Sequence, residues 1–438
     1  MPDLIDNLYN AFDPSQPLPA NDPRYVDFQA VRGDTDVRVD VGSSIRRSRR
    51  MTCQLYTGHR GGGKSTELRR LRAYLIEQNF HVVYFEADEE DIDPEDTQYT
   101  DILLACTRRL IEDLNFAKPD PLLKWLQSRW QEVKELALSE VQFDKMTVDM
   151  QISQFAKLTA NLRTVPSLRH EIRQKVESHT VTLLKALNEF IGEAKKNLPD
   201  GETQLAVIVD NLDRIVPVPQ ASGQLNHEEI FLDRSEQLRA LDCHVVYTVP
   251  ISMVYSQRAT DLMEIYDSNP NILPMVMVKS PEGKVDEPGL AKMKEAIARR
   301  VKCFAPDKAL VGDIFESEET LNGLCLMSGG HVRNLMLLTQ EAIGRTVEFP
   351  ITARSVQRAI TQVRDTYRRT VQAGQWELLA SVAQSKQIEN SDEYRPLLFN
   401  RCLLEYCYYD DEGELQRWYD VHPLMHGIRE FKEAVAKR

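Results

Sequence analysis

The sequence predicts an α/β fold in which a parallel sheet carries helices on both faces. Short apolar segments that favour strands occur at 52–57, 81–87, 204–209, 243–249 and 273–278. Between them lie segments with apolar residues at helical spacing, such as the ones that begin near Lys64 and near Thr100. Strands that alternate with helices usually pair in parallel, so the helices cover both faces of one sheet.

Composition limits the class of protein. The chain has 438 residues, enough for two to four domains at roughly 100–200 residues each. Its 42% apolar and 28% charged residues are typical of a globular protein. The formal net charge of −13 argues against binding to nucleic acid or to anionic lipid through overall charge.

Cysteine usage and hydropathy indicate a cytoplasmic protein. The seven cysteines form no CxxC pair, which favours reduced thiols. The N-terminal residues have neither the basic start nor the apolar core of a signal peptide. No apolar run approaches the about 18 residues of a membrane span, so we expect no membrane segment.

Four parts follow one another along the chain. Residues 1–50 predict an extended lead-in with a short helix at 3–12, and residues 51–285 predict the α/β core. A largely helical insertion is expected within the core at 115–200. Residues 286–370 predict a second helical part, and residues 371–438 predict short helices and then a hairpin.

The insertion is expected to hold two helical stretches, at 122–138 and 167–198, with a less regular piece at 143–165 between them. The hairpin strands are expected near 402–409 and 415–421.

A glycine-rich segment between the first strand and the following helix matches G-x-x-x-x-G-K-[ST]. Glycines let successive backbone N–H groups curl around a phosphate, and the helix start adds positive potential. Lys64 would reach the β- and γ-phosphates, and the Ser65 hydroxyl would bind Mg²⁺. A glycine-rich turn without function is the alternative. The nine residues are Gly58, His59, Arg60, Gly61, Gly62, Gly63, Lys64, Ser65 and Thr66.

The apolar segment 205–209 leads directly into two acids, Asp210 and Asp213. Ligands bind at the carboxyl edge of open α/β sheets, so an acid there can serve Mg²⁺. Asp210 would hold the Mg²⁺ shell through water. Asp213 could orient or deprotonate the water that attacks the γ-phosphate, or it could simply cap a helix.

Two further polar residues are candidates for the same site. Thr248 ends the next apolar strand, where its hydroxyl could touch the γ-phosphate or the water; an ordinary strand residue is the alternative. Arg333 follows two glycines in the first turn of a predicted helix. A cation gains nothing from a helix N-terminus, so Arg333 has either a nucleotide phosphate as partner or only solvent.

Together these motifs resemble the P-loop ATPases of the AAA+ and STAND group, which are related to the origin-recognition and apoptotic-ATPase families. The resemblance covers residues 25–370. It implies a sheet of strand order 5-1-4-3-2, Thr248 at the sensor 1 position, Arg333 at sensor 2 of a helical lid, and bound ATP with Mg²⁺. Tyr25–Asp27 and Val31–Gly33, with Arg32, resemble the segment that lies against the adenine.

The chain departs from motor-type AAA+ proteins in the acids. Asp210-x-x-Asp213 replaces an adjacent Asp-Glu pair, which favours the switch-like STAND branch and slow turnover. No arginine finger can be assigned from the sequence. Four arginines could reach a neighbouring subunit, although solvated helical faces are the more ordinary interpretation: Arg169, Arg173, Arg234 and Arg239.

Residues 371–438 resemble a winged-helix module, which in such proteins binds DNA or holds the ATPase at rest. They carry 8 basic and 12 acidic residues, which favours protein contact because DNA binding depends on phosphate neutralisation. Two basic clusters elsewhere are solvated faces, subunit contacts or a nucleic-acid track. They comprise Arg46, Arg47, Arg49 and Arg50, and Arg354, Arg358, Arg364, Arg368 and Arg369.

The sequence therefore predicts an ATP-dependent molecular switch that binds and slowly hydrolyses ATP. Its nucleotide state would control self-assembly or binding of a protein effector, with bacterial antiviral defence implied by the resemblance alone. The alternative is an AAA+ ATPase that loads or remodels a DNA complex. A non-catalytic scaffold that holds nucleotide for stability is the third.

Overall fold

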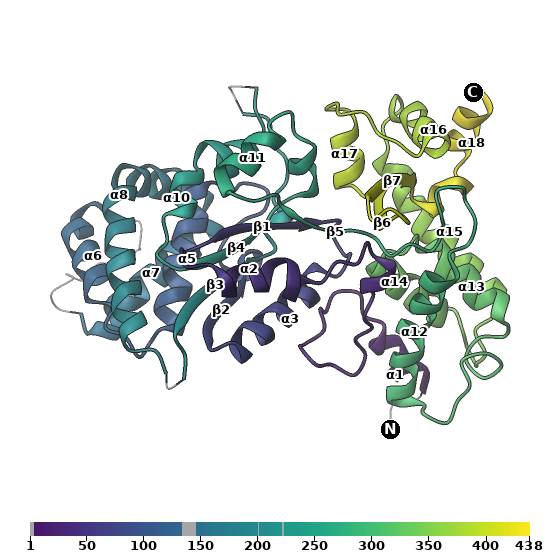
Figure 1. Cartoon of the computed structure of the whole chain (residues 1–438), viewed down its shortest axis with the longest axis horizontal. Coiled ribbons are helices and arrows are strands. Elements are labelled where there is room, and N and C mark those ends of the chain that lie inside the picture. Colours follow the sequence, from purple (N-terminus) through teal and green to yellow (C-terminus); the bar gives the residue numbers. More distant parts are fainter. Residues whose placement is uncertain (1–3, 134–145, 200, 221–222) are drawn as a thin grey trace.

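The computed structural model describes residues 4–133, 146–199, 201–220 and 223–438. A five-stranded sheet with the order β2-β3-β4-β1-β5 forms its centre, and all of its strand pairs are parallel (Figure 1). This is the order 5-1-4-3-2 that the resemblance implied. The strands are β1 (Cys53–Gly58), β2 (Phe80–Glu86), β3 (Gln204–Asp210), β4 (His244–Thr248) and β5 (Asn271–Leu273).

The last strand is shorter than expected, and the prediction of a strand at 273–278 is wrong. β5 pairs with β1 only from Asn271 to Leu273. Beyond it, Met275 N–H donates to Glu405 O at 3.0 Å and Met277 N–H to Val31 O at 2.9 Å. This apolar run is buried against the C-terminal and N-terminal parts of the chain, which its composition alone does not reveal.

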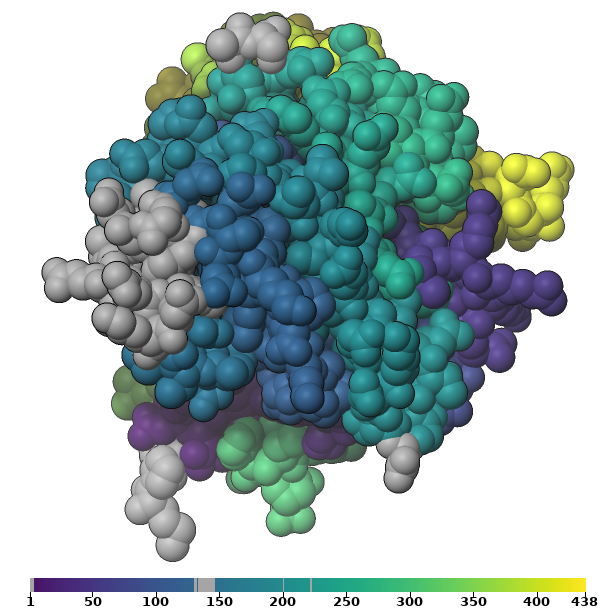
Figure 2. All heavy atoms as spheres, turned by 90° about the vertical axis from the view of Figure 1, so that its left-hand side faces the viewer, coloured from purple at the N-terminus to yellow at the C-terminus, as the bar shows by residue number. Residues whose placement is uncertain are grey.

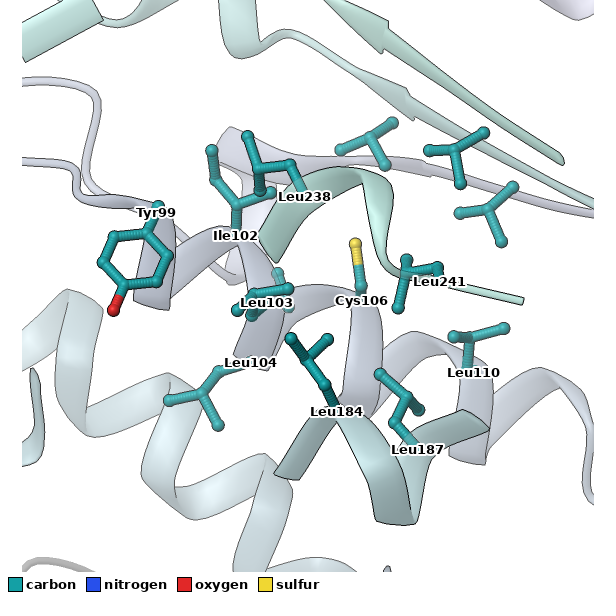
Figure 3. Packing of buried hydrophobic residues seen from close by; sticks show 14 of the residues in the cluster. Tyr99, Ile102, Leu103, Leu104, Cys106, Leu110, Leu184, Leu187, Leu238 and Leu241 are labelled. Atoms are coloured by element: carbon teal, nitrogen blue, oxygen red, sulfur yellow. The ribbon is translucent and has the colours of Figure 1, made fainter. Parts of the chain in front are cut away.

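Helices cover both faces of the sheet. On one face, Leu68, Leu71 and Leu75 of α3 (Lys64–Glu77) are fully buried against the strands. On the other face, α5 (Tyr99–Asp113) packs with helices α8 (Pro166–Lys196) and α10 (Ser235–Arg239), as Figure 3 shows for residues such as Cys106 and Leu187. The short helices α4 (Ala87–Glu90), α9 (Asn226–Glu228) and α11 (Ala259–Tyr266) complete the core.

The insertion lies at one end of the molecule (Figures 1 and 2). The helices of its described residues are α6 (Asp120–Val133), α7 (Val148–Thr164) and α8. The expected irregular piece at 143–165 is wrong from residue 148 on, because Thr147 caps α7 and Phe155, Leu158 and Leu162 are buried at helical spacing. Residues 134–138 of the expected first helix and 143–145 lie outside the described residues.

Arg169 and Arg173, on α8, are not on a solvated face. They are only 6% and 7% exposed. Arg169 pairs with Asp93 at 2.9 Å and Asp96 at 2.7 Å, and Arg173 donates to Asp96 at 2.8 Å and to Asp101 at 3.0 Å. Because both guanidinium groups are used to bind the insertion to the core, neither reaches a neighbouring subunit.

The helical lid and the winged-helix-like module lie at the end of the molecule opposite the insertion (Figure 1). Both were expected, and their buried residues form one apolar cluster that also includes α1 (Leu4–Ala11). Residue 3 of the expected first helix lies outside the described residues. The lid helices are α12 (Glu287–Phe304), α13 (Glu318–Met327), α14 (Val332–Ile343) and α15 (Ala353–Thr370). The module has α16 (Gln375–Ser385), α17 (Tyr394–Phe399), β6 (Leu403–Tyr409), β7 (Leu415–Val421) and α18 (Arg429–Ala436).

Among the described residues, none of the helices is both long and apolar enough for a bilayer.

Candidate nucleotide-binding site

The loop between β1 and α3 has a backbone that depends on glycine. Gly61 and Gly63 have φ angles of 83° and 107°, a region that side chains strain. At Gly62, a Cβ would come within 2.6 Å of the Met275 side chain. The loop therefore turns tightly into the N-terminus of α3, which begins at Lys64. Backbone N–H groups at such a turn form a cradle for a phosphate.

Lys64 is buried at the base of this loop. Its Nζ donates to the carbonyl oxygens of Gly58 at 2.7 Å and His59 at 3.0 Å. The same Nζ lies 2.9 Å from Oδ2 of Asp213, and both side chains are 5% exposed. The structure thus joins the lysine to the second predicted acid, and a phosphate group would compete with that carboxylate for the ammonium.

Asp210 lies at the carboxyl end of β3 and is fully buried. It accepts hydrogen bonds from the Tyr84 hydroxyl at 2.8 Å and from the Asn211 N–H at 2.7 Å. Burial, together with the neighbouring Asp213 carboxylate, raises the pKa of Asp210 to about 6, while the Ser65 hydroxyl acts in the opposite direction. Ser65 and Asp210 therefore lie close together, with oxygen donors of the kind Mg²⁺ prefers.

The Thr248 hydroxyl forms hydrogen bonds with backbone groups and does not line the pocket. Its hydroxyl accepts from Leu212 N–H at 2.9 Å and donates to Val209 O at 3.3 Å, and the side chain is completely buried. It holds the short helix η4 (Leu212–Arg214) that carries Asp213. The sensor 1 role remains a prediction.

A pocket that is open to solvent lies beside the loop, between the core, the lid and the N-terminal segment. Among the described residues that line it, seven side chains are cationic and three are carboxylates. This is a formal surplus of four positive charges in a chain of net charge −13. The cations are Arg24, Arg32, Arg60, Lys64, Arg214, Arg300 and Arg333, and the carboxylates are Asp13, Glu67 and Asp213.

Lid residues close directly over the phosphate loop. The N–H of Arg333 donates to Gly61 O at 3.1 Å, and the His331 ring bonds to Arg60 O at 2.7 Å. The Arg333 side chain lines the pocket, and its Nε donates to Pro14 O at 3.2 Å. Burial and the nearby guanidinium of Arg214 lower the pKa of Arg333. This is expected because the pocket has more cationic side chains than carboxylates, and like charges disfavour the protonated form.

Arg60 and Arg32 occupy different positions around the loop. Arg60 lines the pocket, and its Nε is buried without a hydrogen-bond partner in the described part of the chain. Arg32 instead braces the loop from the N-terminal segment, donating to Gly62 O at 3.2 Å and lying over the Phe28 ring. It is 3% exposed, so its first role is to fix that segment.

The side chain of His59 points away from the pocket. It is 1% exposed, and its Nε2 accepts the N–H of Glu405 in β6 at 2.9 Å. Burial lowers the pKa of His59 to about 3, so the ring is neutral and able to accept. The C-terminal module therefore contacts the phosphate loop, and only the backbone of His59 faces a ligand in the loop.

Part of the pocket lining is apolar. Val26 and Phe28 from the N-terminal segment line it together with Val332 and Met336 of α14. These side chains can enclose a flat base while the loop holds phosphates, as the resemblance implied for the segment around Arg32. The lining also includes Gly61, Gly63, Ser65 and Thr66 of the predicted loop.

Three arginines of the pocket were missed by the sequence analysis: Arg24, Arg214 and Arg300. Arg214 directly follows Asp213, so its place at the sheet edge could have been inferred. Arg24 and Arg300 belong to no motif. Of the other arginine-finger candidates, Arg234 pairs with Glu177 and Arg239 with Asp267, and both side chains are exposed.

Comparisons with known proteins give fold-level likeness only. No protein-family model and no curated protein matches the chain by sequence. It is similar to Cdc6p from Pyrobaculum aerophilum (11% identity over 98% of each chain, TM-score 0.41). It is also similar to the Aeropyrum pernix ORC2 protein in ADPNP–ADP complexes (10% identity, 98% of this chain and 96% of that chain, TM-score 0.43). A third is a Walker-type ATPase of Pyrococcus abyssi (12% identity, 97% of this chain and 99% of that chain, TM-score 0.41). The chemistry of the site is therefore judged from its own residues.

Proposed function

We propose that this protein binds ATP with Mg²⁺ and hydrolyses it slowly. The observation that carries the proposal is the convergence of Lys64, Asp210 and Asp213 at a glycine loop beside a cation-rich pocket. A triphosphate is the ligand that matches a loop of backbone N–H groups, a loop lysine and surplus arginines. A base would contact the apolar side chains of the same pocket.

Each residue has a defined task in this proposal. The γ-phosphate draws the ammonium of Lys64 away from Asp213, so the phosphate oxygens gain a cation and the carboxylate is freed. The freed Asp213 accepts a hydrogen bond from the attacking water and orients it. Arg333 and Arg60 neutralise charge on the phosphates from the lid and the loop.

Ser65 and Asp210 fit a magnesium ion by their donor chemistry. Both offer oxygen, and the buried carboxylate of Asp210 has a raised pKa that a divalent cation would reverse. When bound, Mg²⁺ would supply Lewis-acid neutralisation of the phosphate oxygens. Tyr84 and the Asn211 N–H fix the orientation of the Asp210 carboxylate.

The contacts around the loop support a switch of the STAND type. Loop atoms bond to the lid through Gly61 and Arg60, and to the module through His59. A phosphate bound in the loop therefore affects the core, the lid and the C-terminal module. The lid and the module also share one apolar cluster. In this proposal the nucleotide state controls self-assembly or binding of a protein effector in the cytoplasm. A role in bacterial defence rests on the resemblance alone.

The alternative, loading or remodelling of a DNA complex, is less favoured by the charges. Arg364 of α15 donates to Leu424 O at 3.0 Å, and Arg368 pairs with Glu430 at 2.7 Å, so both face the C-terminal module. The tip of the hairpin carries Asp410 and Asp411. A mobility-shift assay with ATP at low salt tests the alternative, and salt-sensitive DNA binding would support it.

ATP turnover tests the catalytic part of the proposal. We expect Mg²⁺-dependent phosphate release from the purified chain and its loss in Asp213→Asn. Asp242→Asn, which changes an exposed carboxylate that pairs with Lys195, is the matched control and should keep the wild-type rate. Release that persists in Asp213→Asn would refute the role of that residue. Nucleotide binding without any release would instead favour the non-catalytic scaffold.

A further inference from the structure

One buried arginine beside the nucleotide pocket forms no ion pair within 4.0 Å in the described part of the chain. In the described part of the chain the buried arginines are Arg32, Arg169, Arg173 and Arg300. The first three each lie within 4.0 Å of a carboxylate. Arg300, on lid helix α12, is 7% exposed and bonds only to Ala296 O of its own helix, at 3.0 Å.

Such a group is costly to the folded chain. Burial of a guanidinium without a counter-charge costs several kcal/mol unless a ligand supplies the anion. Burial and the nearby Arg24 lower the pKa of Arg300 to about 10, while the Asp22 carboxylate acts in the opposite direction. Asp22 forms its ion pair with Arg24, at 2.7 Å, and attracts Arg300 only from beyond ion-pair distance.

Arg300 opens into a second pocket next to the first. Arg24 and Arg214 line both pockets with it, and residues 13–19 of the N-terminal segment cover the second one. Arg214 is held on one side by Asp88 at 2.7 Å. The pocket thus gathers cations from the lid, the N-terminal segment and the core.

The carboxylates of this second pocket do not satisfy Arg300. Asp13 accepts from the Ser15 hydroxyl and N–H, and Glu86 is bound by Arg69 at 2.8 Å and by Asn211 at 2.9 Å. Glu89, the remaining acid of the lining, is exposed. The described lining thus holds four arginines and three carboxylates, and Arg300 is the one of these arginines without an ion pair.

We propose that Arg300, with Arg24 and Arg214, forms a second anion subsite that takes a phosphoryl group, separate from the phosphate loop. Guanidinium groups bind phosphate oxygens through paired N–H donors, and several arginines match a dianion better than a carboxylate. The phosphoryl group comes either from free phosphate or from a phosphate monoester. This subsite goes beyond ATP binding and does not depend on hydrolysis.

Equilibrium dialysis of the nucleotide-free chain against inorganic phosphate tests the subsite. The phosphate loop itself binds phosphate, so we expect about two ions per chain in the wild type. Lys64→Met should retain about one, Arg300→Met about one, and the double variant none. Loss of all phosphate binding in Lys64→Met, or unchanged binding in Arg300→Met, would overturn the proposal.

Folding of the variant gives an independent readout. Replacing an unpartnered buried guanidinium by methionine removes a cost, so Arg300→Met should raise the melting temperature of the nucleotide-free chain. Arg358→Met, at an exposed position of α15, is the control and should leave it unchanged. A lower melting temperature in Arg300→Met would contradict an unsatisfied charge at this position.

Binding of methyl phosphate to the Lys64→Met variant distinguishes free phosphate from a phosphate monoester as the source of the phosphoryl group. Equal binding of phosphate and methyl phosphate supports a phosphate monoester as occupant, and exclusion of methyl phosphate supports free phosphate. Binding of neither refutes the subsite. Failure of ATP binding to depend on Lys64 would refute the proposed function but would leave the Arg300 result intact.

Discussion

The ion pair between Lys64 and Asp213 makes a quantitative prediction about the nucleotide-free protein. Both side chains are 5% exposed and 2.9 Å apart, and Lys64 also donates to two carbonyl oxygens. Lys64→Met leaves the Asp213 carboxylate buried and unpaired, which should cost about 3 kcal/mol. Asp213→Asn leaves the ammonium with its carbonyl acceptors, so about 1–2 kcal/mol is expected.

The double variant separates stability from binding. With both charges removed, neither position 64 nor position 213 carries an unpaired buried charge, and the loss should be about 1 kcal/mol or less. The two substitutions should thus couple by about 3–5 kcal/mol. ATP binding should not recover with stability, because the phosphates have lost the lysine of the loop.

Urea unfolding of the four nucleotide-free proteins, followed by circular dichroism, measures the coupling. Calorimetric titration with ATP measures binding on the same samples. Single-variant losses that add within about 0.5 kcal/mol would refute the ion pair. ATP binding by the double variant at wild-type affinity would refute the role of Lys64 toward phosphate.

Three further predictions concern the surroundings of the site. The pKa of Asp210 is raised from 3.8 to about 6, so the carboxyl favours the folded state when protonated and loses this contribution as pH rises through 6. The free energy of unfolding of Asp210→Asn should therefore rise by about 3 kcal/mol relative to that of the wild type between about pH 3 and 7, an interval that spans both pKa values. A difference in urea midpoint that stays constant over this interval would contradict the raised pKa. Arg173→Met leaves Asp101 buried and without its ion-pair partner, so the free energy of unfolding should fall by about 3–5 kcal/mol. Hydrogen exchange in α7 and α8 should become faster in this variant. Unchanged exchange would show that Arg173 does not hold the insertion against the core. Arg333→Ala should weaken ATP binding about tenfold or more while the fold survives, and equal affinity in Arg333→Ala and in the exposed control Arg358→Ala would place Arg333 outside the site.

The loop and the acids could be predicted because their residues are adjacent in sequence. Gly58 to Thr66 carry both the turn and the cation, and Asp210 follows its strand directly. The strand order came from the resemblance, since spacing does not determine which strands are neighbours. The strand at 273–278 was overestimated because distant segments, and not the sheet, bury its last residues.

What the sequence did not reveal depends on contacts between distant segments. Arg169 and Arg173 have the helical spacing of a solvated face, and only the approach of residues 93–101 buries them. His59 fits the loop pattern, yet its side chain serves β6, which lies far along the chain. Arg300 belongs to no motif, and its missing carboxylate can be recognised only once its surroundings are known.

A crystal structure with Mg²⁺ and a non-hydrolysable ATP analogue tests the central claim most directly. We predict that the γ-phosphate takes Lys64 Nζ from Asp213 and that the base lies between Phe28 and Met336. Continued contact of Lys64 with Asp213 at 2.9 Å, with the analogue bound elsewhere, would contradict it.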